Sequence, residues 1–411
     1  MSTTQRTSFP QTRFFSALTA AGMPAVPEEF SAVACAQLIP HRTLAEIDAF
    51  IRIFNRITTS AAWLRRITVE APEIARGQRR EICFFTAWDF HLSLEQGWQL
   101  IECNDNGSGF LYAALINRLF YELSDLTKDP AVLPPPTFDE FKKRVAGFIE
   151  RESGEFFGTN HNGLFLIVET AEAIAGGKFY AEFLLLRNLL RERGRRAEIA
   201  TPDALRWDGK ALLLDGEPVG FVINRATDFF WDAEIFAPLR AAYLSGQVYI
   251  APNPFSYATR SDKRLLEFLS LPRWDREIGI TPEERAVLIA HVPETYLLTA
   301  ENLDEIAARK AAFFFKPAHG FASHGVLASS QVGKGRLRQL LRKRLSYVAQ
   351  KTVPKPVLIS TGTDSDTPLW TDLRVWSYRG ERYLISGRAS KRRDFIDLDP
   401  PGGWLPTFEA G

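Results

Sequence analysis

The pattern of apolar and polar positions predicts helices in the first part of the chain and a hairpin after them. Apolar residues recur at near-helical spacing over 44–67, so residues 1 to about 80 are expected to be mostly helical. Two apolar stretches follow, 82–90 and 98–104, and a short polar turn separates them. Two apolar runs joined by such a turn are typical of a β-hairpin.

The next part of the chain alternates between strand and helix patterns. The expected elements are helices over 110–123, 138–149 and 171–194, strands over 164–168 and 197–200, and a hairpin over 212–223. The turn residues Asp215 and Gly216 place the bend of this hairpin. A strand, a helix and a second strand joined by short loops predict a parallel α/β unit.

From about residue 251 onward, the pattern predicts shorter elements. They are helices over 261–269, 302–310 and 335–344, strands over 312–316, 347–350 and 357–359, and a hairpin of 369–378 with 383–389. The fold class is therefore expected to be α/β, with one parallel sheet and mixed or antiparallel sheets.

Three polar residues stand out within the apolar strands of the first hairpin. On a strand, residues i and i+2 share a face, so Glu102 and Asn104 point the same way. Asp89 lies across from them if the hairpin pairs in the matching register. Two carboxylates and an amide oxygen are hard ligands that suit Mg²⁺. The alternative interpretation is a helix cap and loop acids that follow a strand.

Composition narrows the function classes. The net charge of +1 indicates neither a nucleic-acid nor a membrane partner. The three cysteines are far apart and no histidine lies at zinc-binding spacing. Neither a signal-peptide pattern nor an apolar run of about 18 residues is visible, so the chain is expected to be cytoplasmic.

A lysine at the end of a predicted strand is a candidate for phosphate binding. Lys316 follows four apolar residues and precedes a loop that contains Gly320 and Gly325. A lysine on a rigid strand holds its charge in place, and small loop residues let backbone N–H groups approach phosphate oxygens. His319 and His324 lie in this loop and are candidates for phosphate or substrate contact. The alternatives are a surface lysine and solvent-exposed histidines.

The order of these segments resembles the nucleotide-binding half of the ATP-grasp superfamily. The resemblance rests on Lys316 with its loop, then 347–350, 372–376 and 387–390, and finally Gly402-Gly403. In that family an acidic residue and a Glu-x-Asn pair normally follow. Here that set is found instead at Asp89, Glu102 and Asn104. The arrangement is similar to that of circularly permuted ligases of the glutathione synthetase and glutathionylspermidine synthetase group.

The resemblance covers about residues 80–411. Together with the segment before residue 80, it implies three domains. They are 1–155, a helical segment with the metal-binding part of the ATP-grasp core; 156–254, a substrate domain that is similar to the pre-ATP-grasp domain; and 255–411, the ATP-binding subdomains. The sequence departs from the family pattern in two places. The loop after Lys316 is poor in glycine, and no clear asparagine precedes Gly402-Gly403.

The resemblance also implies a role for each candidate residue. Asp89, Glu102 and Asn104 would hold two Mg²⁺ ions that bridge the ATP phosphates, and Lys316 would contact the α- and β-phosphates. The backbone of the segment that includes Gln350, Lys351 and Val353 would face adenine, and Lys263 would be a second phosphate or adenine contact. Arg374 and Arg388 would orient the γ-phosphate and an acyl phosphate. The alternative for either arginine is an ion pair on the sheet, for example with Asp372 or Glu381.

The function that this resemblance implies is an ATP- and Mg²⁺-dependent carboxylate–amine ligase that acts through an acyl phosphate. Its substrates would be a small carboxylate and an amine, such as an amino acid, a peptide or a polyamine. Two alternatives stay open, a phosphotransferase on the same scaffold and a non-catalytic nucleotide-binding protein. Neither the acid nor the amine can be chosen from the sequence.

Overall fold

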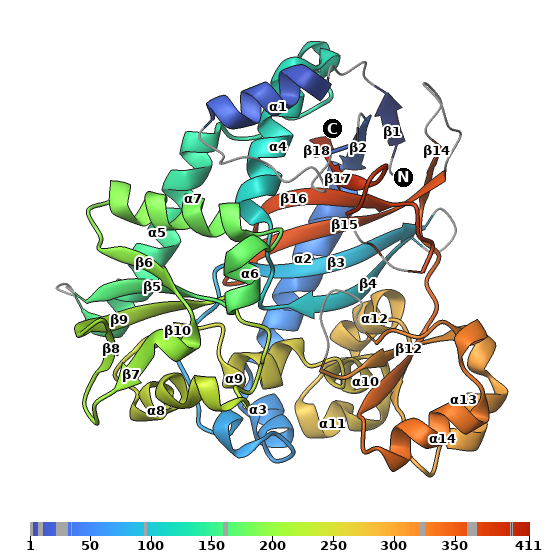
Figure 1. Ribbon diagram of the computed structural model, residues 1–411. Helices are drawn as coiled ribbons and strands as arrows, with labels where there is room; N and C mark the ends of the chain where they lie inside the picture. The colour runs from blue at the N-terminus through green and yellow to red at the C-terminus, as the bar shows by residue number, and fades with distance from the viewer. Residues whose placement is uncertain are drawn as a thin grey trace.

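The computed structural model describes residues 3–6, 11–21, 32–33, 35–93, 97–158, 163–319, 325–359, 368–394, 396 and 398–411. In this part of the chain, four β-sheets and the helices that cover them form the fold (Figure 1). The expected α/β class is confirmed, with one largely parallel sheet and mixed or antiparallel sheets beside it.

The largest antiparallel sheet, here called the central sheet, carries most of the candidate residues. Its strands are β3 (Thr86–Ser93), β4 (Gly97–Asn104), β14 (Val357–Ile359), β15 (Pro368–Tyr378), β16 (Glu381–Ser390) and β17 (Gly403–Leu405). The order is β17-β16-β15-β3-β4, and β14 also pairs with β15. The two predicted hairpins therefore lie side by side, although more than 250 residues separate them in the sequence (Figure 1). The turn residues Glu95 and Gln96 lie outside the described residues.

The first and last parts of the chain pair beside the central sheet, and the N-terminal helices pack on both of its faces. This region contains β1 (Thr3–Arg6), α1 (Gln11–Ala20), β2 (Cys35–Pro40), α2 (His41–Thr58), α3 (Ala61–Thr68) and β18 (Thr407–Ala410). The predicted helices are present, but the expectation of a helical N-terminal segment omitted two strands. Strand β2 pairs in parallel with β18 to form a small sheet with β1. This pairing joins distant segments, so local periodicity does not reveal it.

Alternation along the strands gives the central sheet two different faces. Trp88, Phe90 and Val375 are buried in the same apolar cluster as the side chains of α2. On the opposite face, Trp376 and Tyr378 are buried in the cluster that includes α4 (Phe110–Leu123) and α5 (Phe138–Phe157). Helix α4 has the predicted bounds, whereas α5 is longer than expected. Earlier along β15, on this second face, polar side chains replace the apolar ones.

The parallel sheet lies beside α5 and α7 (Figure 1). It contains β5 (Leu164–Val168), β6 (Ala197–Ala200), β7 (Leu205–Trp207), β8 (Leu212–Leu214), β9 (Glu217–Asn224) and β10 (Tyr249–Ala251), with helices α6 (Ala171–Gly176), α7 (Tyr180–Glu192) and α8 (Ala237–Ser245). Strands β6, β5, β9 and β10 run parallel in that order, which confirms the predicted parallel unit. The helix expected over 171–194 is divided into α6 and α7.

A small antiparallel sheet and several short helices complete the fold. They are α9 (Pro254–Ser256), a π-helical turn (Tyr257–Ser261), α10 (Leu265–Ser270), α11 (Asp275–Ile278), α12 (Pro282–His291), β11 (Thr295–Leu297), α13 (Leu303–Ala308), β12 (Phe313–Pro317), α14 (Lys334–Arg342) and β13 (Tyr347–Lys351). The small sheet has the order β11-β13-β12. Phe313 and Phe315 pack into the apolar cluster formed with α13 and α14. Lys316 alternates with them and faces the other way.

None of the helices in the described ranges is both long enough and apolar enough to cross a membrane.

Candidate active site

A row of charged residues crosses three strands of the central sheet. Asp89 on β3 is the direct partner of Glu102 on β4 and of Arg374 on β15. The register therefore confirms that Asp89 lies across from Glu102. Arg388 on β16 is the partner of Asp372, which lies two residues before Arg374 on the same face of β15.

Two arginines hold Asp89 in the interior. The residue is only 4% exposed. Arg374 donates from Nε to Oδ1 at 2.7 Å and from Nη2 to Oδ2 at 2.8 Å, and Arg388 Nη2 donates to Oδ2 at 2.9 Å. Burial by itself would raise the pKa of Asp89, but the two guanidinium groups outweigh it and hold the pKa well below its usual range. Asp89 is thus a fixed anion at neutral pH.

The ion pair on the sheet, which is the alternative role of these arginines, is present for both: Arg388 pairs with Asp372, and Arg374 pairs with Asp89. Arg388 Nε donates to both carboxylate oxygens of Asp372, at 3.2 and 3.1 Å, and its backbone N–H donates to Oδ1 at 3.2 Å. Burial opposes the charge of Arg388, but Asp372 and Asp89 raise its pKa above the ordinary value. Arg374 pairs with Asp89 and not with Glu381. One guanidinium therefore joins two buried carboxylates.

Glu102 and Asn104 complete the predicted metal-binding set. Glu102 Oε2 lies 3.4 Å from Lys263 Nζ, and a quarter of the Glu102 side chain is exposed. Burial would raise the pKa of Glu102, but Lys263 and other nearby cations lower it. Asn104 Oδ1 accepts a hydrogen bond from the backbone N–H of Asn106 at 2.8 Å.

The donor chemistry of this set fits Mg²⁺. Two carboxylates and an amide oxygen are hard ligands, and each of these oxygens can accept more than one partner. Among the described residues, His, Cys, Asp and Glu side chains form no group of three or more that could hold a metal ion. In the predicted set, the amide oxygen of Asn104 is the third ligand. Glu102 is more accessible than Asp89, which is buried.

Lys316 lies where the small sheet meets the central sheet. Its Nζ donates to Gln350 Oε1 at 2.5 Å, and Gln350 Nε2 donates to the backbone oxygen of Ile101 on β4 at 3.2 Å. Burial lowers the pKa of Lys316 to about 8, although the Glu102 carboxylate opposes this shift. Lys316 is thus half-buried and hydrogen-bonded to Gln350, unlike a freely exposed surface lysine.

The segment predicted to face adenine follows β13 at the same junction. Gln350 and Val353 are buried, whereas Lys351 is exposed and its backbone N–H donates to Glu294 O at 2.8 Å. His91, two residues after Asp89, lies with Nδ1 3.2 Å from Val353 O. Burial lowers the pKa of His91 to about 3, and nearby lysines act in the same direction. His91 is therefore neutral at this junction.

The loop after Lys316 is described at its two ends only. His319 Nδ1 lies 3.7 Å from Asp262 Oδ2, and its ring is 5.2 Å from that of Phe230. The His319 side chain is 38% exposed, in agreement with the alternative of a solvent-exposed histidine, and its partial burial lowers its pKa against the effect of Asp262. Gly325 has φ of +73° and its oxygen accepts from Tyr347 Oη at 3.0 Å. Gly320 and His324 lie outside the described residues.

Sequence reasoning missed a buried arginine beside this site. Arg225 follows β9, is 2% exposed, and donates from Nη2 to Ser108 Oγ. Arg374 Nη1 donates to Ser108 O at 3.5 Å, so the two arginines meet at one residue. Arg225 Nη1 is buried and has no hydrogen-bond partner among the described residues. The signal available in the sequence was a charged residue directly after an apolar strand.

The position of Arg225 is typical of ligand sites in open α/β sheets. It follows β9, and Glu169 follows β5, so both lie at the carboxyl ends of neighbouring parallel strands. Strand β6 lies on one side of β5 and β9 on the other, which makes this the point where the strand order switches. Burial raises the pKa of Glu169 to about 6, and the Arg225 charge opposes that shift.

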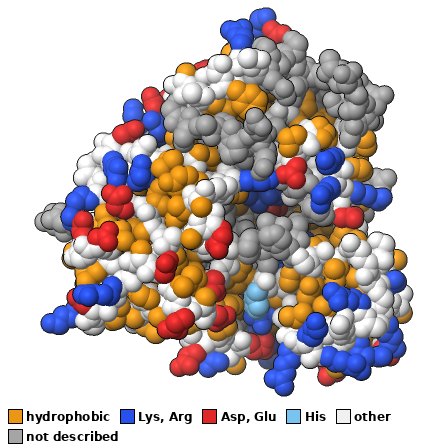
Figure 2. Space-filling model, viewed as in Figure 1, with side chains coloured by type: hydrophobic (Ala, Val, Ile, Leu, Met, Phe, Trp, Pro, Cys, Tyr) orange, Lys and Arg blue, Asp and Glu red, His pale blue; other side chains and the backbone are white. Residues whose placement is uncertain are grey.

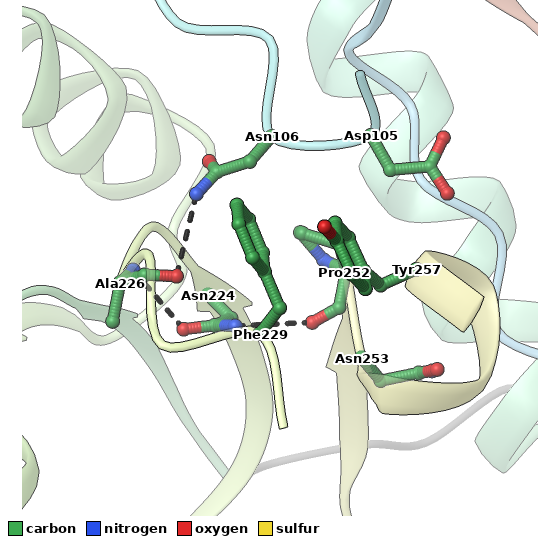
Figure 3. A pocket seen from close by; sticks show the side chains of 8 residues that line it. All are labelled: Asp105, Asn106, Asn224, Ala226, Phe229, Pro252, Asn253 and Tyr257. Atoms are coloured by element: carbon green, nitrogen blue, oxygen red, sulfur yellow. Dashed lines mark hydrogen bonds between the residues drawn. The ribbon is translucent and has the colours of Figure 1, made fainter. Parts of the chain in front are cut away.

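A small pocket lies next to Arg225, between the parallel sheet and the central sheet. Its volume is about 10 Å³, room for about one water molecule. The lining residues are Asp105, Asn106, Asn224, Ala226, Phe229, Pro252, Asn253 and Tyr257 (Figure 3). Asn106 Nδ2 donates to Arg225 O at 2.8 Å, and Phe229 stacks on Tyr257 with ring centroids 4.0 Å apart. Side chains therefore fill most of this crevice.

Comparisons with known proteins identify the fold. No protein-family model matches the chain. No curated protein matches it either. Among solved structures, a glutathione synthetase-like effector of Globodera pallida in its apo form is similar over 97% of this chain and 96% of its own, with 12% identity and a TM-score of 0.60.

Two further solved structures match less closely. A protein of Methylobacillus flagellatus described as a gamma-glutamylcysteine synthetase covers 88% of this chain and 87% of its own, with 12% identity and a TM-score of 0.45. An ATP-grasp RimK domain protein of Sphaerobacter thermophilus covers 55% of this chain and 91% of its own, with 14% identity and a TM-score of 0.30. The circular permutation stays a prediction. The chain has the overall α/β fold of this glutathione synthetase-like effector, in agreement with the glutathione synthetase-like resemblance that the sequence predicts.

Proposed function

We propose that this protein is an ATP- and Mg²⁺-dependent ligase that joins a carboxylate to an amine through an acyl phosphate. One observation carries the proposal: four cationic side chains lie around the carboxylates of Asp89 and Glu102. Arg374 and Arg388 bind Asp89, and Lys263 lies beside Glu102. Lys316 is close enough to Glu102 for each to shift the pKa of the other. Buried cations in such number favour a polyanionic ligand such as a triphosphate.

The proposed chemistry follows from the fact that a carboxylate has no good leaving group. An amine cannot easily displace oxide from a carboxylate. Transfer of the γ-phosphoryl group of ATP to a carboxylate oxygen gives an acyl phosphate and ADP. The amine then forms the C–N bond, phosphate leaves with that oxygen, and the amine loses a proton to solvent. Phosphoryl transfer mainly requires positioning and charge neutralisation, which arginine and lysine side chains supply.

The proposed metal ligands are Asp89, Glu102 and Asn104. When bound, Mg²⁺ would neutralise the phosphate oxygens and hold them in place. Asp89 and Glu102 are both ionised at neutral pH because neighbouring cations lower their pKa values. Proton loss would therefore not be needed before metal binding.

We propose that Arg225 binds the carboxylate of the acid substrate. The free Nη1 of this buried guanidinium is suited to a carboxylate, the acceptor that arginine binds best. Ser108 places Arg225 next to Arg374, so an acid bound there would lie near the proposed phosphoryl-transfer site. The amine would be an amino acid, a peptide or a polyamine.

The test is ADP release by the purified protein, with ATP and Mg²⁺ and panels of amino acids, short peptides and polyamines. A ligase releases ADP and phosphate when an acid and an amine are both present, and an amide product accumulates. A phosphorylated product that accumulates without any amine would favour the phosphotransferase. ATP binding without turnover on any panel would favour a non-catalytic nucleotide-binding protein.

A further inference from the structure

The surface of α14 is strongly basic although the chain is nearly neutral. Residues 334–344 include six Lys or Arg residues and no Asp or Glu, whereas the net charge of the whole chain is +1. We define the α14 surface by these six residues, Lys334, Arg336, Arg338, Arg342, Lys343 and Arg344. All six are exposed. Lys and Arg side chains gather at the lower right of Figure 2, where Figure 1 draws α14.

The helical period explains why these cations share one surface. Leu337 and Leu340 are 0% and 2% exposed and pack with Phe313 and Phe315 against the small sheet. The remaining positions of the helix therefore point outward. This is the side of the small sheet opposite to Lys316, so the α14 surface is separate from the proposed ATP site.

The cations of this surface are mostly not neutralised by the protein. Within the described residues, Lys334 is the member that forms an ion pair, with Asp304 at 2.8 Å. Arg336 donates instead to the neutral Gln339 Oε1 at 2.7 Å. The basic run after α7 differs, because Arg191 pairs with Glu198 at 2.5 Å and Arg196 pairs with Glu217. The α14 surface thus carries more uncompensated charge than the basic run at the end of α7.

We propose that the α14 surface binds an acidic segment of a protein partner. Four of the six cations are arginines, which bind carboxylates through two parallel hydrogen bonds. The basic area is narrow, because α13 lies next to it with Asp304 and Glu305 exposed. A short acidic peptide can avoid those two carboxylates, whereas a duplex or a bilayer presents negative charge over a wider area.

Other polyanions fit this surface less well. Leu337 and Leu340 are buried, and the exposed Leu345 that follows Arg344 offers one apolar side chain, whereas membrane insertion of an amphipathic helix needs a whole apolar face. Among the large apolar side chains that are exposed in the described residues, the aromatic one is Phe15 on α1, so no ring near α14 can stack on nucleic-acid bases.

The test is the affinity of the full chain for a fluorescent oligoglutamate peptide, measured by anisotropy. The variant Arg338→Gln/Arg342→Gln/Lys343→Gln removes three cations from the α14 surface. The matched control Lys143→Gln/Arg144→Gln/Arg151→Gln removes three exposed cations from α5. We expect the wild type to bind in a salt-sensitive manner, the α14 variant to bind about tenfold more weakly, and the control to bind like the wild type.

The proposal is overturned if the wild type does not bind the peptide, or if both variants bind it equally well. A short DNA duplex or anionic vesicles that bind more tightly than the peptide, with loss in the α14 variant, would overturn the assignment to an acidic protein segment. Circular dichroism melting of both variants checks that the fold is intact. The measurement does not involve ATP, so its result is independent of the proposed ligase activity.

Discussion

Two buried carboxylates of this protein, Asp89 and Glu152, are both held by arginine but have different surroundings. Glu152 is 3% exposed and accepts from Tyr378 Oη at 2.6 Å, from Tyr249 Oη at 3.2 Å and from Arg379 Nη2 at 2.7 Å. Neutral hydroxyls thus supply much of its hydrogen bonding. The same arginine also pairs with Glu155.

The balance of charge separates the two clusters. Near Glu152, the guanidinium of Arg379 pairs with two carboxylates, those of Glu152 and Glu155. In the row that contains Asp89, Arg374, Arg388, Lys263 and Lys316 surround Asp89, Glu102 and Asp372. Buried ions need partners, and cations in excess of carboxylates favour an anion from outside the protein. The Glu152 cluster joins α5 to the β15–β16 hairpin, whereas the Asp89 cluster is arranged for a ligand.

The largest expected effect is the loss of turnover on Glu102→Gln. This change keeps the size of the side chain but removes the charge of a proposed metal ligand whose side chain is a quarter exposed. We expect ATP-dependent ADP release to fall by at least about a hundredfold, because even partners of metal ligands contribute 10- to 100-fold. Glu155→Gln, which alters a carboxylate of the Glu152 cluster, should keep full activity. Full activity in Glu102→Gln would contradict the metal assignment.

The second largest expected effect is a difference between the two clusters in the free energy of unfolding that a substitution costs. Asp89→Asn leaves Arg374 without its buried counter-ion, so we expect a loss of about 3 kcal/mol in the free energy of unfolding. Glu152→Gln should cost about 1 kcal/mol, since Arg379 is partly exposed and keeps Glu155 as a partner. Urea denaturation of both variants measures the difference. A larger loss for Glu152→Gln would show that charge balance does not separate the clusters.

The pH dependence of ATP binding tests the cation at the sheet junction. Because burial lowers the pKa of Lys316 to about 8, its ammonium is mostly charged at pH 7 and mostly neutral at about pH 9. ATP affinity should therefore fall as pH rises through 8, by up to about tenfold per pH unit. Calorimetric titrations across this range measure it. In Lys316→Arg the guanidinium stays charged, so the fall should disappear; an unchanged fall would assign the titration to another group.

The smallest expected effect concerns Lys351. Its side chain is exposed, and the predicted adenine contacts come from the backbone of this segment. Lys351→Ala should change the ATP dissociation constant by less than about twofold. A tenfold weaker affinity would mean that the side chain itself binds the nucleotide.

Local sequence patterns predicted the elements whose formation depends on neighbouring residues. The two apolar stretches 82–90 and 98–104, joined by a polar turn, predicted the hairpin. The apolar run before Lys316 predicted β12. The shared face of Glu102 and Asn104 follows from the two-residue period of a strand, which a short segment carries completely.

Long-range pairing was beyond those patterns. Arg374 meets Asp89 across 285 residues of sequence, and β2 pairs with β18 from opposite ends of the chain. Arg225 was missed because its significance depends on Ser108, which belongs to a different sheet region. Such contacts depend on how strands align in the folded protein, and local periodicity does not encode that alignment.

The central claim is that the excess of cations around Asp89 and Glu102 binds the phosphates of ATP. Its most direct test is isothermal titration calorimetry of ATP with Mg²⁺ against the wild type and Lys316→Met, with Lys351→Ala as a control. We predict binding by the wild type and the control, and a loss of at least about tenfold in affinity for Lys316→Met. Absence of ATP binding by the wild type, or equal affinity in all three proteins, would contradict the claim.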